Sequence, residues 1–335
     1  MEFATRLEAE GDDHEISAGR FIRMWLGDAP TIEVQTSGST GTPKTILLEK
    51  EKMIYSAKAT GTYFKVGEGT SALLCLSADY IAGMMMLVRA MVMGWDLHVV
   101  APERDALVQY DNPYDFVAMV PYQVMHSMHA LDKVKKLIIG GGPVSRELET
   151  MLQEVSTEAF ATYGMTETIS HIAVRRLNGA GRSREFTALP DVELSLDERE
   201  CLVIDAPGVS DEKVITNDIV DLKSARSFVW LGRYDYVINS GGIKVHPEKV
   251  EEKLQDSIKF PFIIASAIDK EWGEQVILVV ESVEDSELPD FTQYFSVLEK
   301  YERPKRIYTV SRFPYTKTGK IKRKDVLQML KNYKK

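Results

Sequence analysis

Cysteine is nearly absent from this sequence, and its scarcity narrows the class of protein. Only Cys75 and Cys201 occur among 335 residues, each within an apolar, strand-like stretch. A small scaffold stapled by disulfides needs many more cysteines, so we expect two buried, reduced thiols. A metal site built on this pair is not expected.

Long apolar runs are missing as well. No uninterrupted apolar stretch approaches the ~20 residues that a membrane span requires. The first fifteen residues contain several acids and no apolar core of the signal-peptide type. We therefore expect a cytoplasmic protein without a membrane span.

Positive charge is not in excess either. The formal net charge is −9, so a general affinity for nucleic acid is not expected. The composition, 44% hydrophobic and 27% charged, is ordinary for a globular protein, and the length suggests about two domains. The sequence leaves a homo-oligomer open.

From Thr31 to about Gly164, short apolar strands alternate with amphipathic helical stretches. The predicted strands are Thr31–Gln35, Ala72–Ser77, Leu97–Ala101, Phe116–Val120, Lys136–Ile139 and Ala159–Tyr163. The predicted helices are Glu51–Tyr63, Ile81–Met93, Tyr122–Leu131 and Arg146–Glu154. Such alternation is typical of a mostly parallel sheet flanked by helices, in which ligands bind beyond the carboxyl ends of the strands.

After Thr166 the pattern changes to short alternating β segments and then to mixed elements. The last ninety or so residues predict strands at Phe262–Ile268 and Val276–Glu281 and helices at Phe291–Lys300 and Lys324–Lys331. We expect an α/β protein in which residues 1–232 form a large N-terminal domain. Residues 233–235 are the expected hinge, and residues 236–335 a small, mobile α+β lid domain.

The strongest local motif directly follows the first predicted strand. It reads Thr36-Ser37-Gly38-Ser39-Thr40-Gly41-Thr42-Pro43-Lys44. Two glycines permit a tight turn, and the hydroxyl and backbone N–H groups are suited to surrounding a polyphosphate. It is not a Walker A loop, because Pro43 precedes the lysine where that loop needs glycine. Taken alone, an ordinary surface loop remains an alternative.

Five further motifs follow in order. They are Gly140-Gly141-Gly142-Pro143, Tyr163-Gly164-Met165-Thr166-Glu167, Thr216-Asn217-Asp218, Gly232-Arg233-x-Asp235 with Gly242-x-Lys244, and Gly319-Lys320-Ile321-x-Arg323. With the hydroxyl-rich loop, they resemble the signatures of the acyl-CoA synthetase, peptide-synthetase adenylation and luciferase superfamily. The resemblance spans about Thr31 to Lys324, and it departs at Asn217, where the family usually has glycine.

The resemblance implies an AMP-forming ligase that uses ATP, Mg²⁺ and coenzyme A. Its implied ATP-binding residues are Thr36, Ser37, Gly38, Ser39, Thr40, Gly41, Lys44, Gly140, Gly141, Gly142, Tyr163, Asp218 and Arg233. A carboxylate attacks a polyanion poorly, so catalysis must neutralise the phosphates and align the attack. Thr166 is expected at the α-phosphate, Glu167 at Mg²⁺, and Lys320 as the catalytic charge at the α-phosphate and the carboxylate.

The family's enzymes run two half-reactions by rotating the small domain. Asp235 matches the hinge position of that rotation. In the second pose, the resemblance places Ser240, Gly241, Gly242 and Lys244 along a channel for the thiol of coenzyme A. Glycine suits this channel because a side chain would block close backbone approach.

The expected acid follows from a second resemblance. Only 35 residues precede the hydroxyl-rich loop, and this compactness resembles some o-succinylbenzoate–CoA ligases of bacterial menaquinone synthesis. The Tyr80–Ala90 segment resembles theirs, although Tyr80 replaces a histidine. Arg89 is the expected counter-charge for the second carboxylate of o-succinylbenzoate, with Thr168, Ser170 and His171 lining the same pocket.

Other interpretations stay open at this stage. Arg89 is equally a candidate for a structurally paired or snorkelling arginine. The same ATP motifs fit another aromatic or short-chain acyl-CoA ligase, and a stand-alone adenylation enzyme that loads a carrier protein. A non-enzymatic binding relative is a further alternative, against which Lys320, Glu167 and Asp218 argue.

Overall fold

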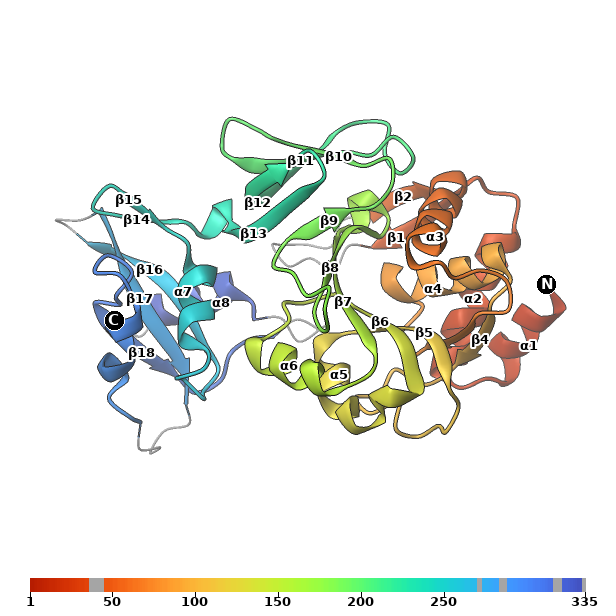
Figure 1. Cartoon of the computed structure of the whole chain (residues 1–335), viewed down its shortest axis with the longest axis horizontal. Helices are drawn as coiled ribbons and strands as arrows, with labels where there is room; N and C mark the ends of the chain where they lie inside the picture. The colour runs from red at the N-terminus through yellow and green to blue at the C-terminus, as the bar shows by residue number, and fades with distance from the viewer. Residues whose placement is uncertain (36–44, 270–272, 283–287, 316–320, 333–335) are drawn as a thin grey trace.

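The protein has a large α/β part and a smaller β-rich part at its C-terminal end (Figure 1). The computed structural model describes residues 1–35, 45–269, 273–282, 288–315 and 321–332. The predicted α/β class is confirmed. Within the described residues, no helix has the length and apolar character needed to cross a membrane.

An eleven-stranded sheet runs through the large part, with strand order β10-β11-β12-β13-β9-β8-β7-β6-β5-β3-β4. Its parallel strands are β3 (Ser71–Leu74), β4 (Asp96–Val99), β5 (Tyr114–Met119), β6 (Val134–Ile139) and β7 (Glu158–Gly164). Its antiparallel strands are β8 (His171–Arg176), β9 (Phe186–Ala188), β10 (Glu193–Leu196), β11 (Cys201–Asp205), β12 (Val214–Ser224) and β13 (Ser227–Arg233). The change of direction at β7 matches the change of sequence pattern near Thr166.

Helices cover both faces of the parallel strands. Neighbouring strand residues point to opposite faces, so Leu74 joins the core beneath α3 (Lys50–Phe64) and α4 (Ile81–Met93), whereas Leu73 joins the core on the other side. That second core is closed by α5 (Pro121–Ser127), η1 (Met128–Lys133), α6 (Arg146–Met151) and η2 (Leu152–Glu154). The serine before α6 caps it: the Ser145 Oγ accepts the Leu148 N–H at 3.1 Å.

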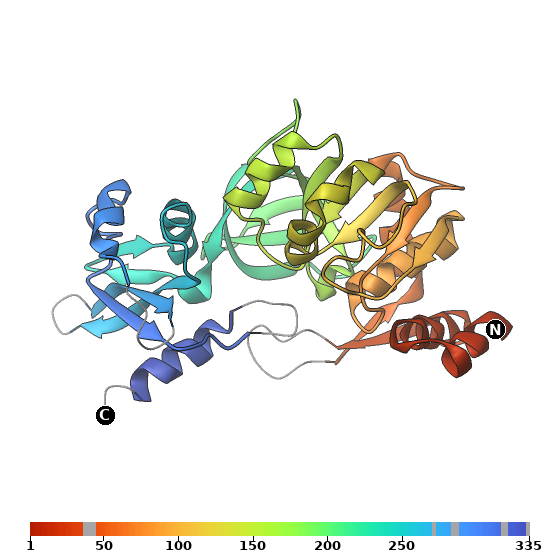
Figure 2. The same cartoon turned by 90° about the horizontal axis from the view of Figure 1, so that it is seen from below.

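The N-terminal region differs from the prediction. Thr31–Gln35 was expected in the parallel sheet, but as β1 it pairs antiparallel with β2 (Thr45–Glu49) in a separate two-stranded sheet. Its partner strand and the two helices before it, α1 (Glu2–Glu10) and α2 (Asp13–Leu26), are not among the predicted elements. Figure 2 shows these helices at the end of the molecule opposite α8.

The small part is a five-stranded sheet with a core on each face. Its strands are β14 (Ile238–Ser240), β15 (Ile243–Val245), β16 (Phe262–Asp269), β17 (Gly273–Glu281) and β18 (Arg306–Val310). On one face lie α7 (Pro247–Leu254) and η5 (Phe291–Val297), and on the other α8 (Arg323–Asn332). The expected α-helix over Phe291–Lys300 is wrong in kind and length, since η5 is a 3₁₀ helix.

The two parts join through a short 3₁₀ turn. The strand β13 ends at Arg233, η4 spans Tyr234–Tyr236, and β14 begins at Ile238. The turn lies between the two sheets in Figure 1, at the residues that the sequence assigns to a hinge. The hinge at residues 233–235 and the division into residues 1–232 and 236–335 stay predictions.

Candidate active site

Two predicted motifs meet at the carboxyl edge of the parallel strands. The pairing of Met119 with Ile139 aligns the ends of β5 and β6, and Ile139 pairs with Ala161 on β7, which continues for three residues to Gly164. The glycine run 140–142 follows β6 directly, and the Gly140 N–H donates to the Met119 carbonyl at 3.1 Å. The structure therefore brings this run beside the turn that begins at Gly164.

The turn after β7 is tight and strained. A side chain at Gly164 would place its Cβ 2.2 Å from the Ser170 carbonyl oxygen, so only glycine permits the chain to fold back here. Ile169 is buried at φ 64°, a conformation that is costly for a β-branched residue. The turn contains η3 (Thr166–Thr168) and leaves the Glu167 side chain exposed.

The Thr168 side chain forms hydrogen bonds within this turn. It is fully buried, and its hydroxyl lies within hydrogen-bond distance of the Met165 N–H and carbonyl and of the Ser170 carbonyl. These contacts account for the bonding capacity of one hydroxyl, which stabilises the turn. The Thr168 hydroxyl thus contacts backbone groups within the turn.

A carboxylate with two aromatic donors occupies the neighbouring strands. Asp218 on β12 accepts the Tyr163 O–H at 2.6 Å and the Trp230 Nε1–H at 3.2 Å. Burial, reinforced by the nearby Asp218 carboxylate, raises the pKa of Tyr163 well above its ordinary value, so Tyr163 stays a donor. The structure thus joins two residues of separate predicted motifs, and Trp230 is a member that sequence reasoning missed.

The proposed hinge carboxylate is held from two sides. Asp235 accepts from Arg233 Nη2 at 3.0 Å, and the Asn217 amide lies 3.4 Å from each of its oxygens. Arg199 donates to the Asn217 Oδ1 at 2.8 Å, which orients the amide nitrogen toward the hinge. Its guanidinium also lies 5.2 Å from the Tyr234 ring centroid. Asn217, which stands where the family usually has glycine, therefore contacts the predicted hinge residue Asp235 through its side chain.

Arg89 is buried without a carboxylate partner among the described residues. Its side chain is 2% exposed; Nη2 donates to the Ser170 Oγ at 2.7 Å, and Nε has no partner. Burial lowers its pKa to about 10, so the guanidinium remains charged near neutral pH. An uncompensated buried charge is costly, which favours an anion that binds there.

A neutral histidine extends this cluster. The His171 Nδ1 lies 3.3 Å from the Ser170 Oγ, and its Nε2 lies 3.5 Å from the hydroxyl of Thr60, a residue that sequence reasoning missed. Burial, with the charge of Arg89 adding to it, lowers the pKa of His171 well below its ordinary value. We call Arg89, Ser170, His171 and Thr60 the Arg89 cluster.

Tyr80 does not belong to the Arg89 cluster. It precedes α4 as its N-cap, and nine residues of helix separate the two positions by ~13 Å along the axis, on opposite helix faces. The pocket residue predicted at Tyr80 therefore lies apart from the predicted counter-charge.

Several predicted residues lie outside the described part of the chain. They are Thr36, Ser37, Gly38, Ser39, Thr40, Gly41, Lys44 and Lys320. The residues of the predicted thiol channel are described: Ser240 ends β14, Gly241 and Gly242 form the turn to β15, and Lys244 Nζ on β15 lies 3.7 Å from Glu200 Oε2. In Figure 1 these two strands lie at the far left, away from β7.

The carboxyl group of Glu248 is buried against Gly232 and Arg233, where the large part joins the small part. Gly232, at φ 149°, would meet the Glu248 Oε2 at 2.6 Å if it carried a Cβ, and the Arg233 N–H lies 3.4 Å from Glu248 Oε1. Burial raises the pKa of Glu248 to about 7, although the charge of Arg323 opposes the shift.

Replacing this carboxyl should change the pH dependence of stability. The folded protein holds the Glu248 proton up to about pH 7 and the unfolded chain only to about pH 4.5, so the free energy of unfolding should fall between these values as pH rises. The slope for one proton approaches ~1.4 kcal/mol per pH unit. Glu248→Gln should remove that slope in urea titrations from pH 4.5 to 7.5, whereas exposed Glu193→Gln should retain it. Equal slopes in wild type and Glu248→Gln would contradict the assignment.

A family model described as AMP-binding enzyme matches residues 28–210, more than half of the chain. The chain therefore belongs to the AMP-binding enzyme family. The predicted membership in the adenylate-forming superfamily is confirmed.

The individual proteins that are similar to this chain include AMP-forming ligases. A solved acyl-CoA synthetase (AMP-forming)/AMP-acid ligase II-like protein from Dyadobacter fermentans is 34% identical, with 98% of each chain covered and a TM-score of 0.65. The 2-succinylbenzoate–CoA ligase of Enterococcus faecalis is 26% identical over 85% of this chain and 67% of its own length. The predicted resemblance to o-succinylbenzoate–CoA ligases is thus confirmed.

A second solved structure has a similar fold. The o-succinylbenzoate coenzyme A synthetase from Bacillus subtilis, solved in complex with ATP and magnesium ion, covers 88% of this chain and 69% of its own with a TM-score of 0.77. At 19% identity this likeness concerns the fold alone.

Proposed function

We propose that this AMP-binding enzyme is an ATP-dependent acyl-CoA ligase whose acid is o-succinylbenzoate. In the first step a carboxylate oxygen attacks the α-phosphorus of ATP, and acyl-AMP forms as pyrophosphate leaves. In the second step the thiol of coenzyme A attacks the acyl carbon; a thioester forms, AMP leaves, and the thiol proton passes to solvent. Family membership and the resemblance to 2-succinylbenzoate–CoA ligases support the proposal.

The nucleotide is assigned to the carboxyl edge of the sheet. Asp218 and Arg233, 4.0 Å apart, are the proposed ribose contacts, and Thr166 is the proposed α-phosphate contact. The described residues contain no cluster of three or more metal-ligating side chains. An ion shared with ATP phosphates needs few protein ligands, and exposed Glu167 fits that role.

The Arg89 cluster carries the substrate assignment. A dicarboxylate leaves a second charge after one carboxylate has been activated, and a buried guanidinium with an unpartnered Nε is complementary to that charge. A benzoate or acetate molecule has no second carboxylate and would leave the guanidinium uncompensated.

A panel of acids tests the proposal. Pyrophosphate release should be measured with o-succinylbenzoate, benzoate and acetate, each with and without coenzyme A. We expect turnover confined to o-succinylbenzoate and a coenzyme A thioester as product. Strong turnover on benzoate or acetate would refute the substrate, and turnover that needs a carrier protein would refute the acceptor.

Arg89→Met should separate binding from stability. Methionine fills much of the same volume without the charge, so kcat/KM for o-succinylbenzoate should fall ~100-fold as the second carboxylate loses its partner. The free energy of unfolding should stay equal or rise by roughly 1–4 kcal/mol, because a buried unpaired charge is removed. Unchanged kcat/KM in the steady-state assay would contradict the counter-charge role. Arg20→Met, a substitution at an exposed position on α2, is the control.

A further inference from the structure

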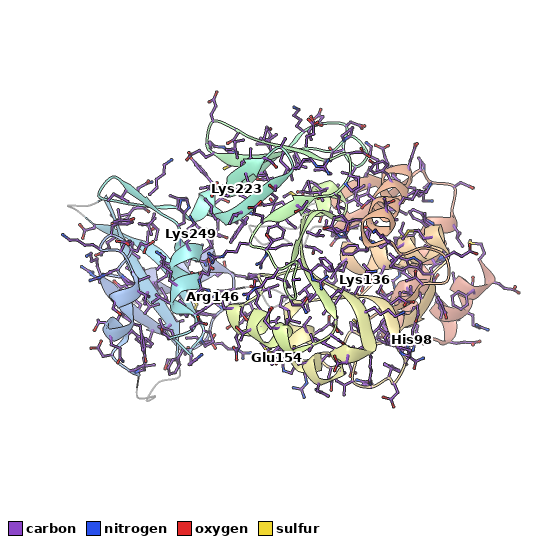
Figure 3. All side chains as sticks on the ribbon, in the orientation of Figure 1. His98, Lys136, Arg146, Glu154, Lys223 and Lys249 are labelled. Carbon is purple, nitrogen blue, oxygen red and sulfur yellow. The ribbon has the colours of Figure 1, made fainter. Side chains whose placement is uncertain are left out.

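Two arginines of the large part meet one carboxylate on a helix of the small part. Arg146, the first residue of α6, has its Nη2 3.1 Å from Oε1 of Glu252 on α7, and Arg184 Nη2 donates to the same oxygen. Figure 3 shows Arg146 where α6 approaches α7. We call Arg146, Arg184 and Glu252 the clamp.

Neighbouring groups extend the same contact. Arg146 Nη1 lies 3.6 Å from the Asp256 Oδ2, and the Arg146 backbone N–H lies 3.5 Å from the Gln255 Oε1. All three acceptors lie within five residues along the end of α7 and just beyond it. One turn of the small part thus faces the start of α6.

The Glu252 carboxyl of the clamp is ionised at neutral pH. Burial alone would raise the pKa of Glu252, but the hydrogen bond from Arg146 and the charges of both arginines outweigh it and lower the pKa. The contact is therefore electrostatic at neutral pH. Its side chains are 42% exposed at Arg146 and Glu252, so salt should weaken it.

Arg182, which is near Arg184 in the sequence, pairs with a residue of the large part and, among the described residues, not with the small part. Arg182, two residues before Arg184, pairs at 3.4 Å with Glu149 of α6, inside the large part. Arg175 also contacts Glu149. The loop after β8 thus contains one arginine that reaches across to the small part and one that does not.

We propose that the clamp holds the small part in the pose seen here, and that it must open when the small part turns for the second half-reaction. This inference rests on the proposed two-step function. The β14–β15 turn proposed for the thiol channel lies away from β7 in this pose, so the pose held is that of adenylation (Figure 1). A half-exposed ion cluster suits a contact that forms and breaks in each cycle, because its net free energy is small.

A fluorescence energy-transfer measurement tests the clamp directly. Dyes are attached at Glu154→Cys in the large part and at Ile268→Cys, 89% exposed, in the small part. The native Cys75 and Cys201 are buried and should stay unlabelled. Glu252→Gln should lower the ratio of this pose to the alternatives about three- to fivefold, whereas Arg182→Gln should leave it unchanged.

Ionic strength gives a second readout. Raising salt from 50 to 500 mM should shift the wild-type distribution in the same direction as Glu252→Gln and should move the variant much less. Glu252→Gln should also slow adenylation, by at most the three- to fivefold change in the ratio, at unchanged KM for ATP and without slowing thioester formation from pre-made acyl-AMP.

Identical energy-transfer distributions for wild type and Glu252→Gln would overturn the clamp, as would an equal shift in Arg182→Gln. Should no carboxylate support turnover, the proposed function fails, while the energy-transfer comparison still decides whether the clamp holds the pose.

Discussion

Asp218→Ala should raise the KM for ATP about 30- to 100-fold and leave the Tyr163 hydroxyl without its acceptor. In the folded protein the carboxylate already accepts from Tyr163 at 2.6 Å and Trp230 at 3.2 Å, so both oxygens are oriented before the nucleotide arrives. Hydrogen bonds from two ribose hydroxyls to one charged, preorganised group account for an effect of this size. The measurement is the KM for ATP in the pyrophosphate-release assay.

Two matched variants separate orientation from charge. Tyr163→Phe removes one donor and keeps the carboxylate, so its KM for ATP should rise less than tenfold. Asp218→Asn keeps the shape and loses the charge, so it should fall between Tyr163→Phe and Asp218→Ala. If Asp218→Ala bound ATP as wild type does, the ribose assignment would be wrong.

Lys320→Ala should slow acyl-AMP formation by about 10²- to 10³-fold, the range for loss of one preorganised charge at a transition state. Thioester formation from pre-made acyl-AMP should stay within about twofold of wild type, because the two-pose proposal withdraws this lysine before the second step. The half-reactions are measured separately by quenched flow.

An exposed lysine nearby provides the control. Lys324→Ala, on α8, should leave both half-reactions unchanged. Equal losses in both half-reactions for Lys320→Ala would contradict the two-pose account.

The regular elements of the large part were predictable because their patterns are strong. Ile81–Met93 coincides with α4, and five of the predicted apolar strands became β3 to β7. The fate of Thr31–Gln35 was not predictable, since an apolar alternation does not reveal whether a strand joins the main sheet or pairs with Thr45–Glu49. Phe291–Lys300 failed because 3₁₀ and α-helical spacings are hard to distinguish over two turns.

The site was predictable where motifs fixed the residue type. Gly164 and Asp218 belong to such motifs, and the structure gives each a physical reason: a close backbone approach and a pair of aromatic donors. Arg89 was predicted from an arginine in an apolar helix, and its burial favours the anion-binding interpretation over the snorkelling one.

Residues without a motif were not predictable. Arg199, in the turn between β10 and β11, contacts Asn217 on β12, and Thr60 on α3 contacts His171 on β8. Such contacts depend on strand order and helix packing, which residue spacing does not contain. The one available signal for the Arg199 contact was Asn217 itself, because it has a side chain where the family usually has glycine.

The most direct test of the account asks whether this chain makes an acyl-adenylate. Wild-type protein is incubated with α-labelled ATP, Mg²⁺ and o-succinylbenzoate without coenzyme A, and the products are separated by chromatography. We expect o-succinylbenzoyl-AMP, and its conversion to a thioester with release of AMP when coenzyme A is added. Absence of labelled acyl-AMP with o-succinylbenzoate and every other carboxylate offered would contradict the account.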